Sequence, residues 1–220
     1  MKKIAVILSG CGVYDGSEIH ETCAALLALH REGAVAVACA PSGLQLQVVD
    51  HLRKQPVEGP SRDILTESAR LVRGDIRPLT EVSPRDIDGV LLPGGFGAAR
   101  NLCTFATEGA ACRVHPEVEA FLRDAYALRK PIAAMCIAPV VLARLFGHGG
   151  KPSVTIGNDA STAALVEAMG ARHVVCEATG IVVDEEARLV TTPAYMLAHD
   201  ISQVFDSAAA AVKKLLMFGA

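Results

Sequence analysis

The chain has 220 residues, of which 51% are hydrophobic and 4% aromatic, and its formal net charge is −3. No segment approaches the roughly 20 apolar residues of a membrane-spanning helix, and no basic stripe with interleaved aromatics indicates a nucleic-acid partner. The seven cysteines are irregularly spaced and include no C-x-x-C pair, which argues against a disulfide scaffold and a zinc knuckle. We therefore expect one cytoplasmic domain spanning residues 1–220.

Short apolar runs alternate with helical stretches in the first half of the chain. The opening apolar run, 4–8, is too short for the core of a secretory signal, so it predicts a strand. In chain order we predict a strand at 3–8, a helix capped by Ser17 and ending near Arg31, a strand at 34–40, a mainly irregular segment at 41–60 with a short strand near 46–49, a helix at 62–72 capped by Ser61, an edge-like strand at 75–79 and a buried strand at 88–92.

The alternation continues in the second half. In order we predict a partly helical segment at 101–111, a helix at 116–128, a strand at 131–135, a helix at 139–146, a strand at 153–156, a helix at 159–169, a strand at 173–176, a hairpin of 181–183 with 189–192, and a helix at 198–216. This order predicts an α/β fold with a doubly wound, mostly parallel sheet and helices on both faces. Ligands in such folds bind at the carboxyl ends of the strands.

One of those strand ends carries a cysteine. In Pro131-Ile-Ala-Ala-Met-Cys136-Ile-Ala-Pro139 an apolar strand leads directly into a helix, as in a nucleophile elbow. A thiol at a helix N-terminus is favoured as the thiolate, and the N–H of Ile137 points to where an oxyanion would form. The spacing is equally compatible with an inert, buried core cysteine.

A second strand end carries Leu92-Pro-Gly-Gly-Phe-Gly97. The adjacent glycines Gly94 and Gly95 let the backbone approach a ligand, and the N–H of Gly95 is a candidate second oxyanion donor. The segment is not G-x-G-x-x-G and no P-loop lysine follows, so a nucleotide cofactor is not indicated. An ordinary tight turn is the alternative.

The first helix opens with two carboxylates. Glu18 and Glu21 suit the positive end of the helix dipole, so capping is their default role, and His20 between them is by default solvated. Three residues apart, the carboxylates share a face, so at least one can face the cleft. A carboxyl group buried against a thiolate would have a raised pKa and could move a proton.

Taken together, these segments resemble the ThiJ/PfpI superfamily. The matching stretches are Ile132-Ala-Ala-Met-Cys-Ile-Ala-Pro139, Leu91-Leu-Pro-Gly-Gly-Phe-Gly-Ala98 with Asn101-Leu102, Glu21-Thr22, and Thr191-Thr-Pro-Ala194. The stretch Ile7–Glu21 is similar to a bacterial, glyoxalase-type branch of that family whose name refers to isoprenoid biosynthesis. The resemblance implies a flavodoxin-like sheet and a homodimer.

The resemblance also implies chemistry. Cys136 would be the nucleophile, hydrogen-bonded to Glu21, with the amides of Gly95 and Ile137 as the oxyanion hole. The expected activity is a glyoxalase that needs neither cofactor nor metal and converts small dicarbonyls, glyoxal to glycolate or methylglyoxal to lactate. Apparent repair of glycated protein would be the same chemistry.

One family feature is missing, which keeps two alternatives open. Many relatives carry a histidine in the loop after the strand that follows the elbow helix, whereas 154–159 contains none. His20 is the nearest substitute, and Gly94, Asn101 and Tyr195 are candidate accessory residues. A glutamine amidotransferase would need that histidine. A non-catalytic sensor would need only a thiol that oxidises readily.

Overall fold

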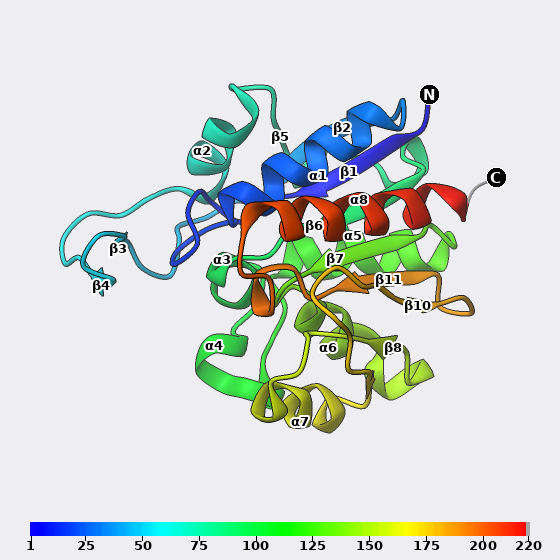
Figure 1. Cartoon of the computed structure of the whole chain (residues 1–220). Coiled ribbons are helices and arrows are strands. Elements are labelled where there is room, and N and C mark those ends of the chain that lie inside the picture. Colours follow the sequence, from blue (N-terminus) through cyan, green and yellow to red (C-terminus); the bar gives the residue numbers. More distant parts are fainter. Residues whose placement is uncertain (219–220) are drawn as a thin grey trace.

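A seven-stranded sheet forms the centre of the molecule in the computed structural model, which describes residues 1–218 (Figure 1). Its strand order is β10-β11-β7-β6-β1-β2-β5, and every neighbouring pair is parallel except β10 and β11. The strands are β1 (Lys3–Ile7), β2 (Val35–Ala40), β5 (Arg77–Pro78), β6 (Gly89–Leu92), β7 (Ile132–Met135), β10 (Val182–Asp184) and β11 (Leu189–Thr192). The predicted mostly parallel sheet is confirmed.

Both faces of the sheet are buried, which explains why its strands are apolar throughout rather than alternating. Along β1, Ala5 and Ile7 belong to one hydrophobic cluster, whereas Ile4 and Val6 belong to the other. Successive side chains of a strand point to opposite faces. A single apolar run therefore contributes to two cores.

Helices cover both faces, as predicted. The first cluster receives side chains from α3 (Phe96–Arg100), α4 (Phe105–Glu108), α5 (Pro116–Ala127), α6 (Pro139–Gly150) and α7 (Ala160–Ala168). The second receives side chains from α1 (Ile19–Arg31), α2 (Ile64–Ala69) and α8 (Ile201–Met217). Helices α1 and α8 lie side by side across the front of the sheet in Figure 1. No helix within residues 1–218 combines the length and apolar character needed to cross a membrane.

The predicted caps of two helices are wrong. Glu18 caps α1, because its carboxylate accepts the Glu21 N–H at 2.7 Å, while the Ser17 hydroxyl accepts the Ser9 N–H at 2.9 Å. Asp63, rather than Ser61, caps α2. A carboxylate placed at the N-cap satisfies the free N–H groups of the first turn as well as a hydroxyl does.

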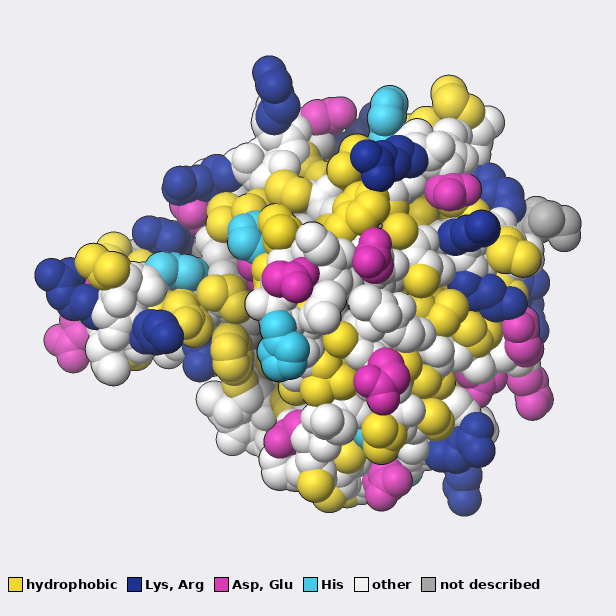
Figure 2. Space-filling model, in the orientation of Figure 1, with side chains coloured by type: hydrophobic (Ala, Val, Ile, Leu, Met, Phe, Trp, Pro, Cys, Tyr) yellow, Lys and Arg dark blue, Asp and Glu magenta, His cyan; other side chains and the backbone are white. Residues whose placement is uncertain are grey.

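Four predicted segments also differ. The 41–60 segment holds a small hairpin, β3 (Val49–Asp50) with β4 (Gln55–Pro56), which projects from the rest of the molecule in Figures 1 and 2. The strands expected at 153–156 and 173–176 shrink to β8 (Ser153–Val154) and β9 (Arg172–His173), a separate parallel pair. The segment after Gly95, for which an ordinary tight turn was the alternative, begins α3.

Candidate active site

Cys136 occupies a sharp turn between β7 and α6. Its φ of +59° is in the left-handed region, which a residue with a side chain adopts at a cost of about 1–3 kcal/mol. The turn is held because the Cys136 N–H donates to the Thr192 carbonyl at 2.9 Å and the Ala138 N–H donates to the Met135 carbonyl at 2.9 Å. Pro139 then begins α6. The geometry is that of the predicted nucleophile elbow.

Glu21 reaches this turn from the first helical turn of α1. One carboxylate oxygen, Oε2, accepts the Gly94 N–H at 2.8 Å, and the other, Oε1, accepts the Tyr195 N–H at 3.2 Å. The carboxyl group is fully buried and hydrogen-bonds to the Cys136 side chain. The structure thus brings together the thiol and the carboxyl group that the sequence singled out.

The two adjacent glycines are required by close packing. A Cβ on Gly94 would lie 2.3 Å from the Cβ of Cys136 and 2.6 Å from Oε2 of Glu21. Gly95 has a φ of +94°, and a Cβ there would lie 2.4 Å from the Gly16 carbonyl oxygen. The backbone at Gly94 therefore lies close to both the thiol and the carboxyl group, and no larger residue fits.

Two backbone amides converge on the sulfur. Hydrogen bonding by the backbone N–H groups of Gly95 and Ile137 lowers the pKa of the Cys136 thiol, against the larger effect of burial. Gly95 is also the N-cap of α3. An oxygen on a carbon bonded to Sγ would lie next to the same donors, so the arrangement can stabilise an oxyanion.

Burial controls the electrostatics of the pair. It raises the pKa of the Glu21 carboxyl to about 7, with the Glu18 carboxylate as the second cause and the two amide donors opposing it. Burial, followed by the charge of Glu21, also raises the pKa of the Cys136 thiol well above its usual value. The expectation that the helix N-terminus would favour the thiolate is therefore wrong for the resting thiol, because desolvation outweighs it.

The effect of Glu21 on the thiol depends on the carboxyl being ionised. When Glu21 holds a proton, its repulsion of a thiolate disappears and its O–H can donate to the sulfur. The two groups thus form a coupled acid pair. Attack by the sulfur requires its proton to move, and the carboxyl group of Glu21 is the acceptor in contact with it.

A cavity of about 510 Å³ lies over the sulfur, and Cys136 is 8% exposed. Phe96, Phe105 and Met196 supply apolar wall, and Glu18 and Tyr195 supply polar groups. The volume falls within the usual range for small-molecule sites, and an apolar wall with few polar groups is typical of them. The cavity is an entrance to the thiol for a small substrate.

Sequence reasoning missed part of this wall. Glu18 performs its expected capping role and also lines the cavity. Phe105 and Ala106 of α4 and Thr162 of α7 line it as well, although no motif marks them. Their segments carry no pattern that indicates where α4 and α7 pack, so only the tertiary structure identifies them.

The histidine candidate reaches the site indirectly. His20 is exposed, and its Nδ1 lies 2.7 Å from the hydroxyl of Tyr195, whose ring borders the cavity. Adjacent helix residues point in different directions, so His20 and Glu21 do not face the same space. His20 contacts Tyr195 and is not among the residues that line the cavity.

The side chain of Asn101 holds neighbouring loops together. Its side-chain amide donates to the carbonyls of Ser9 and Asp15, both at 2.8 Å, and its Oδ1 accepts the Leu46 N–H at 2.9 Å. Asn101 is buried and ties together three loops. Asn101 is not among the residues that line the cavity over Cys136.

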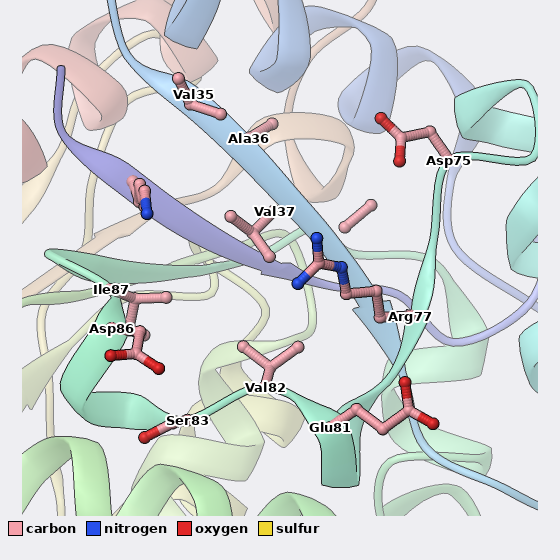
Figure 3. A pocket seen from close by; sticks show the side chains of 12 residues that line it. Val35, Ala36, Val37, Asp75, Arg77, Glu81, Val82, Ser83, Asp86 and Ile87 are labelled. Carbon is pink, nitrogen blue, oxygen red and sulfur yellow. The ribbon is translucent and has the colours of Figure 1, made fainter.

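Other features of the described chain do not add to this site. A smaller pocket of about 270 Å³ lies at the β2 edge of the sheet, between charged side chains such as Asp75, Arg77 and Glu81, and has no cysteine in its lining (Figure 3). Within residues 1–218, no three His, Cys, Asp or Glu side chains gather as a metal-binding group.

Solved structures of other proteins share this architecture. An isoprenoid biosynthesis protein with an amidotransferase-like domain from Ehrlichia chaffeensis is 35% identical with a TM-score of 0.91, covering 98% of this chain and 99% of that one. A glyoxalase III from Candida albicans, 13% identical with a TM-score of 0.63, covers 100% of this chain and 98% of its own and shares the fold.

Curated relatives are also similar in sequence. The human glutamine amidotransferase-like class 1 domain-containing protein 3, mitochondrial, is 44% identical over 97% of this chain and 82% of its own. The ES1 protein homologue of Rattus norvegicus, also named mitochondrial, is 43% identical over 97% of this chain and 83% of its own. These names contradict the expected cytoplasmic location. The DJ-1/PfpI family model matches residues 3–195, and the chain belongs to the DJ-1/PfpI family.

Proposed function

We propose that this protein is a cofactor-independent glyoxalase that converts a small 1,2-dicarbonyl, such as glyoxal or methylglyoxal, into a 2-hydroxy acid. The supporting observation is the convergence of one thiol, one carboxyl group and two amide donors beneath a cavity. Cys136, Glu21, Gly95 and Ile137 supply these groups. The cavity over the sulfur has room for a small molecule.

The reaction begins with transfer of the thiol proton of Cys136 to the carboxylate of Glu21. Sγ then bonds to an aldehyde carbon, and the electrons of the carbonyl π bond move to its oxygen. The N–H groups of Gly95 and Ile137 stabilise that oxyanion. The proton held by Glu21 passes to the oxygen and gives a neutral hemithioacetal.

The hemithioacetal rearranges by internal proton transfer. The carboxylate of Glu21 takes the C–H proton from the carbon bonded to sulfur, which gives an enediolate. Glu21 then returns this proton to the neighbouring carbon, while the hydroxyl proton on the first carbon passes to the neighbouring oxygen. The product is a thioester of the 2-hydroxy acid. Water cleaves the C–S bond and restores the Cys136 thiol, so the net change is addition of one water and no external oxidant or reductant is needed.

Neither alternative gains support from a specific feature. An amidotransferase would pair the cysteine with a histidine, whereas no histidine lines the cavity within the described residues. A peroxide sensor would need an exposed thiol that ionises easily. Burial and the Glu21 charge instead raise the pKa of Cys136, and the side chain is 8% exposed.

The direct test follows doubly ¹³C-labelled glyoxal by NMR in the presence of wild type, Cys136→Ala, Glu21→Gln and Cys23→Ala. We expect Cys136→Ala to lose turnover and Glu21→Gln to lose about 10²–10⁴-fold, as for removal of a general acid–base. Cys23 is exposed on α1 and outside the site, so Cys23→Ala is the matched control and keeps its rate. Formation of glycolate by Cys136→Ala at the wild-type rate would refute the proposal.

A further inference from the structure

The cavity over Cys136 is much larger than the smallest dicarbonyls. Its volume is about 510 Å³. A water molecule takes up about 30 Å³ in the liquid, so glyoxal, with its two carbons and two oxygens, takes up at most about 120 Å³. Glyoxal would therefore leave roughly three quarters of the cavity to water. Most of this space has no role in the proton transfer between Cys136 and Glu21.

Aromatic side chains gather around this space. The chain has six phenylalanines, three tyrosines and no tryptophan, and Phe96, Phe105 and Tyr195 all line the cavity. They belong to α3, α4 and the 3₁₀ turn Ala194–Met196, which are separate in the sequence. Met196 adds a thioether, a group that packs favourably against aromatic rings. The fold thus brings a large share of its few aromatic rings to one small-molecule cavity.

Phe96 is exposed although it is large and apolar. Its exposed fraction is 45%. Two neighbours hold the ring: the ring of Tyr14 stacks on it with centroids 6.3 Å apart, and the guanidinium carbon of Arg100 lies 5.1 Å from its centroid. A side chain already held in place loses little conformational freedom when a ligand covers it. Exposed apolar surface beside a cavity is typical of a binding site.

We propose that the preferred substrate is an aryl glyoxal, in which an aromatic ring is attached to the ketone carbon of the dicarbonyl. The proposal rests on the glyoxalase function proposed above. The ring packs in the space lined by Phe96, Phe105 and Met196, and aromatic pairs are favourable beyond the area that they bury. Phenylglyoxal, with eight carbons and two oxygens, takes up at most about 300 Å³ by the same measure, which the cavity accommodates.

The charged groups around the cavity favour an uncharged substituent. Glu18 and Arg100 line it with opposite charges. Each already has a partner, because the Glu18 carboxylate accepts the Glu21 N–H at 2.7 Å and the Arg100 guanidinium donates to the Tyr14 carbonyl at 2.7 Å. A substituent of either charge would meet one like charge and would lose its hydration in an apolar space.

An aryl glyoxal reacts by the same proton transfer. Sγ of Cys136 bonds to the aldehyde carbon, and the proton that Glu21 removes from this carbon goes to the neighbouring carbon, which carries the ring. Water then cleaves the C–S bond, so phenylglyoxal and one water give mandelic acid and the restored thiol. A ring held in one orientation presents one face of that carbon to Glu21. The product should therefore be a single enantiomer.

The first test compares kcat/KM for phenylglyoxal and methylglyoxal in wild type, Phe96→Ala and Ala106→Trp, and separates the mandelate enantiomers by chiral chromatography. In wild type we expect a phenyl-to-methyl ratio of about 10–100, the gain from burying one aromatic side chain. Phe96→Ala removes part of the wall, and Ala106→Trp fills the cavity from an exposed position on α4. Each should lower the ratio at least about tenfold. Comparing ratios between variants cancels the intrinsic reactivity of the two substrates.

Two matched controls make the same changes away from the cavity. Phe205 on α8 also packs against an arginine, with the guanidinium carbon of Arg31 4.9 Å from its ring centroid, and Ala164 is exposed on α7. Neither residue lines the cavity. Phe205→Ala and Ala164→Trp should therefore keep the wild-type ratio and the single mandelate enantiomer.

A second measurement separates this inference from the glyoxalase proposal. The probes are 2-hydroxyacetophenone and hydroxyacetone, which carry the same hydroxyketone group on a ring or a methyl and are not dicarbonyls. We expect 2-hydroxyacetophenone to protect Cys136 from iodoacetamide at an at least about tenfold lower concentration than hydroxyacetone, and Phe96→Ala to lose this difference. Such protection without turnover of any dicarbonyl would refute the glyoxalase function and support the aromatic site. Equal protection by the two probes, or a phenyl-to-methyl ratio that Phe96→Ala and Ala106→Trp leave unchanged, would overturn the aryl preference.

Discussion

The buried carboxyl group of Glu21 makes the stability of the fold depend on pH in a way that one substitution isolates. The folded state raises the pKa of this group from 4.5 to about 7, chiefly because burial disfavours its charged form. Below pH 4.5 the group is protonated in both the folded and the unfolded chain, and its contribution is fully present. As pH rises from 4.5 to about 7, the unfolded chain ionises while the folded chain still holds the proton. The free energy of unfolding therefore falls until the folded group also ionises above pH 7.

The size of the effect follows from the two pKa values. At about 1.36 kcal/mol per pKa unit, the rise from 4.5 to about 7 corresponds to about 3 kcal/mol. Gln cannot ionise, so the free energy of unfolding of wild type minus that of Glu21→Gln should fall by about 3 kcal/mol between pH 4.5 and pH 8. A constant offset is also expected, because the Gln amide has one acceptor oxygen for the two backbone N–H groups of Gly94 and Tyr195.

Urea unfolding followed by circular dichroism at half-unit pH steps measures this difference, and the subtraction cancels the titration of all other groups. Glu32→Gln is the matched control, because Glu32 is exposed at the opposite end of α1. It should show little change with pH. A wild-type minus Glu21→Gln difference that stays constant from pH 4.5 to 8 would show that the Glu21 carboxyl is not held in a desolvated site.

Two further substitutions test the packing. Gly94→Ala should abolish turnover and lower the thermal midpoint, because its Cβ would lie 2.3 Å from the Cβ of Cys136. Gly149→Ala is the control and should keep both properties, because a Cβ there meets nothing within 4 Å. Native activity in Gly94→Ala would contradict the close approach of Gly94 to Cys136. Asn101→Ala should cost about 1–3 kcal/mol in urea unfolding, because it leaves buried backbone groups without partners. Its kcat, measured below the unfolding transition, should be near wild type, and a selective loss of kcat would instead place Asn101 in the reaction.

The sequence predicts the fold well because its signals are local and repeated. The apolar runs at 88–92 and 131–135 can be buried on both faces only between helices, and the structure places them as β6 and β7 at the centre of the sheet. The strands expected at 153–156 and 173–176 pair with each other, as β8 and β9, outside the central sheet. The sequence could not show this, because an apolar run does not specify which strand it pairs with. Pairing depends on where α7 packs, which is a tertiary property.

The sequence predicted which residues form the candidate site, but it predicted their ionisation only partly. The elbow at Cys136 has a local signature, and the family resemblance supplied Glu21 as its partner. The raised pKa of the thiol could not be predicted, because it depends on how completely neighbouring elements exclude water. The same limit explains why the sequence did not indicate Phe105 in the cavity wall.

The central claim is that Cys136 and Glu21 share a proton and react as one unit. Its most direct test is the rate of Cys136 alkylation by iodoacetamide from pH 5 to 10, measured by peptide mass spectrometry with exposed Cys23 as the internal standard. In wild type the rate should rise through an inflection near pH 7, the pKa of Glu21, and then level off. In Glu21→Gln that inflection should vanish and the rate should rise only at alkaline pH, whereas identical profiles in the two proteins would contradict the account.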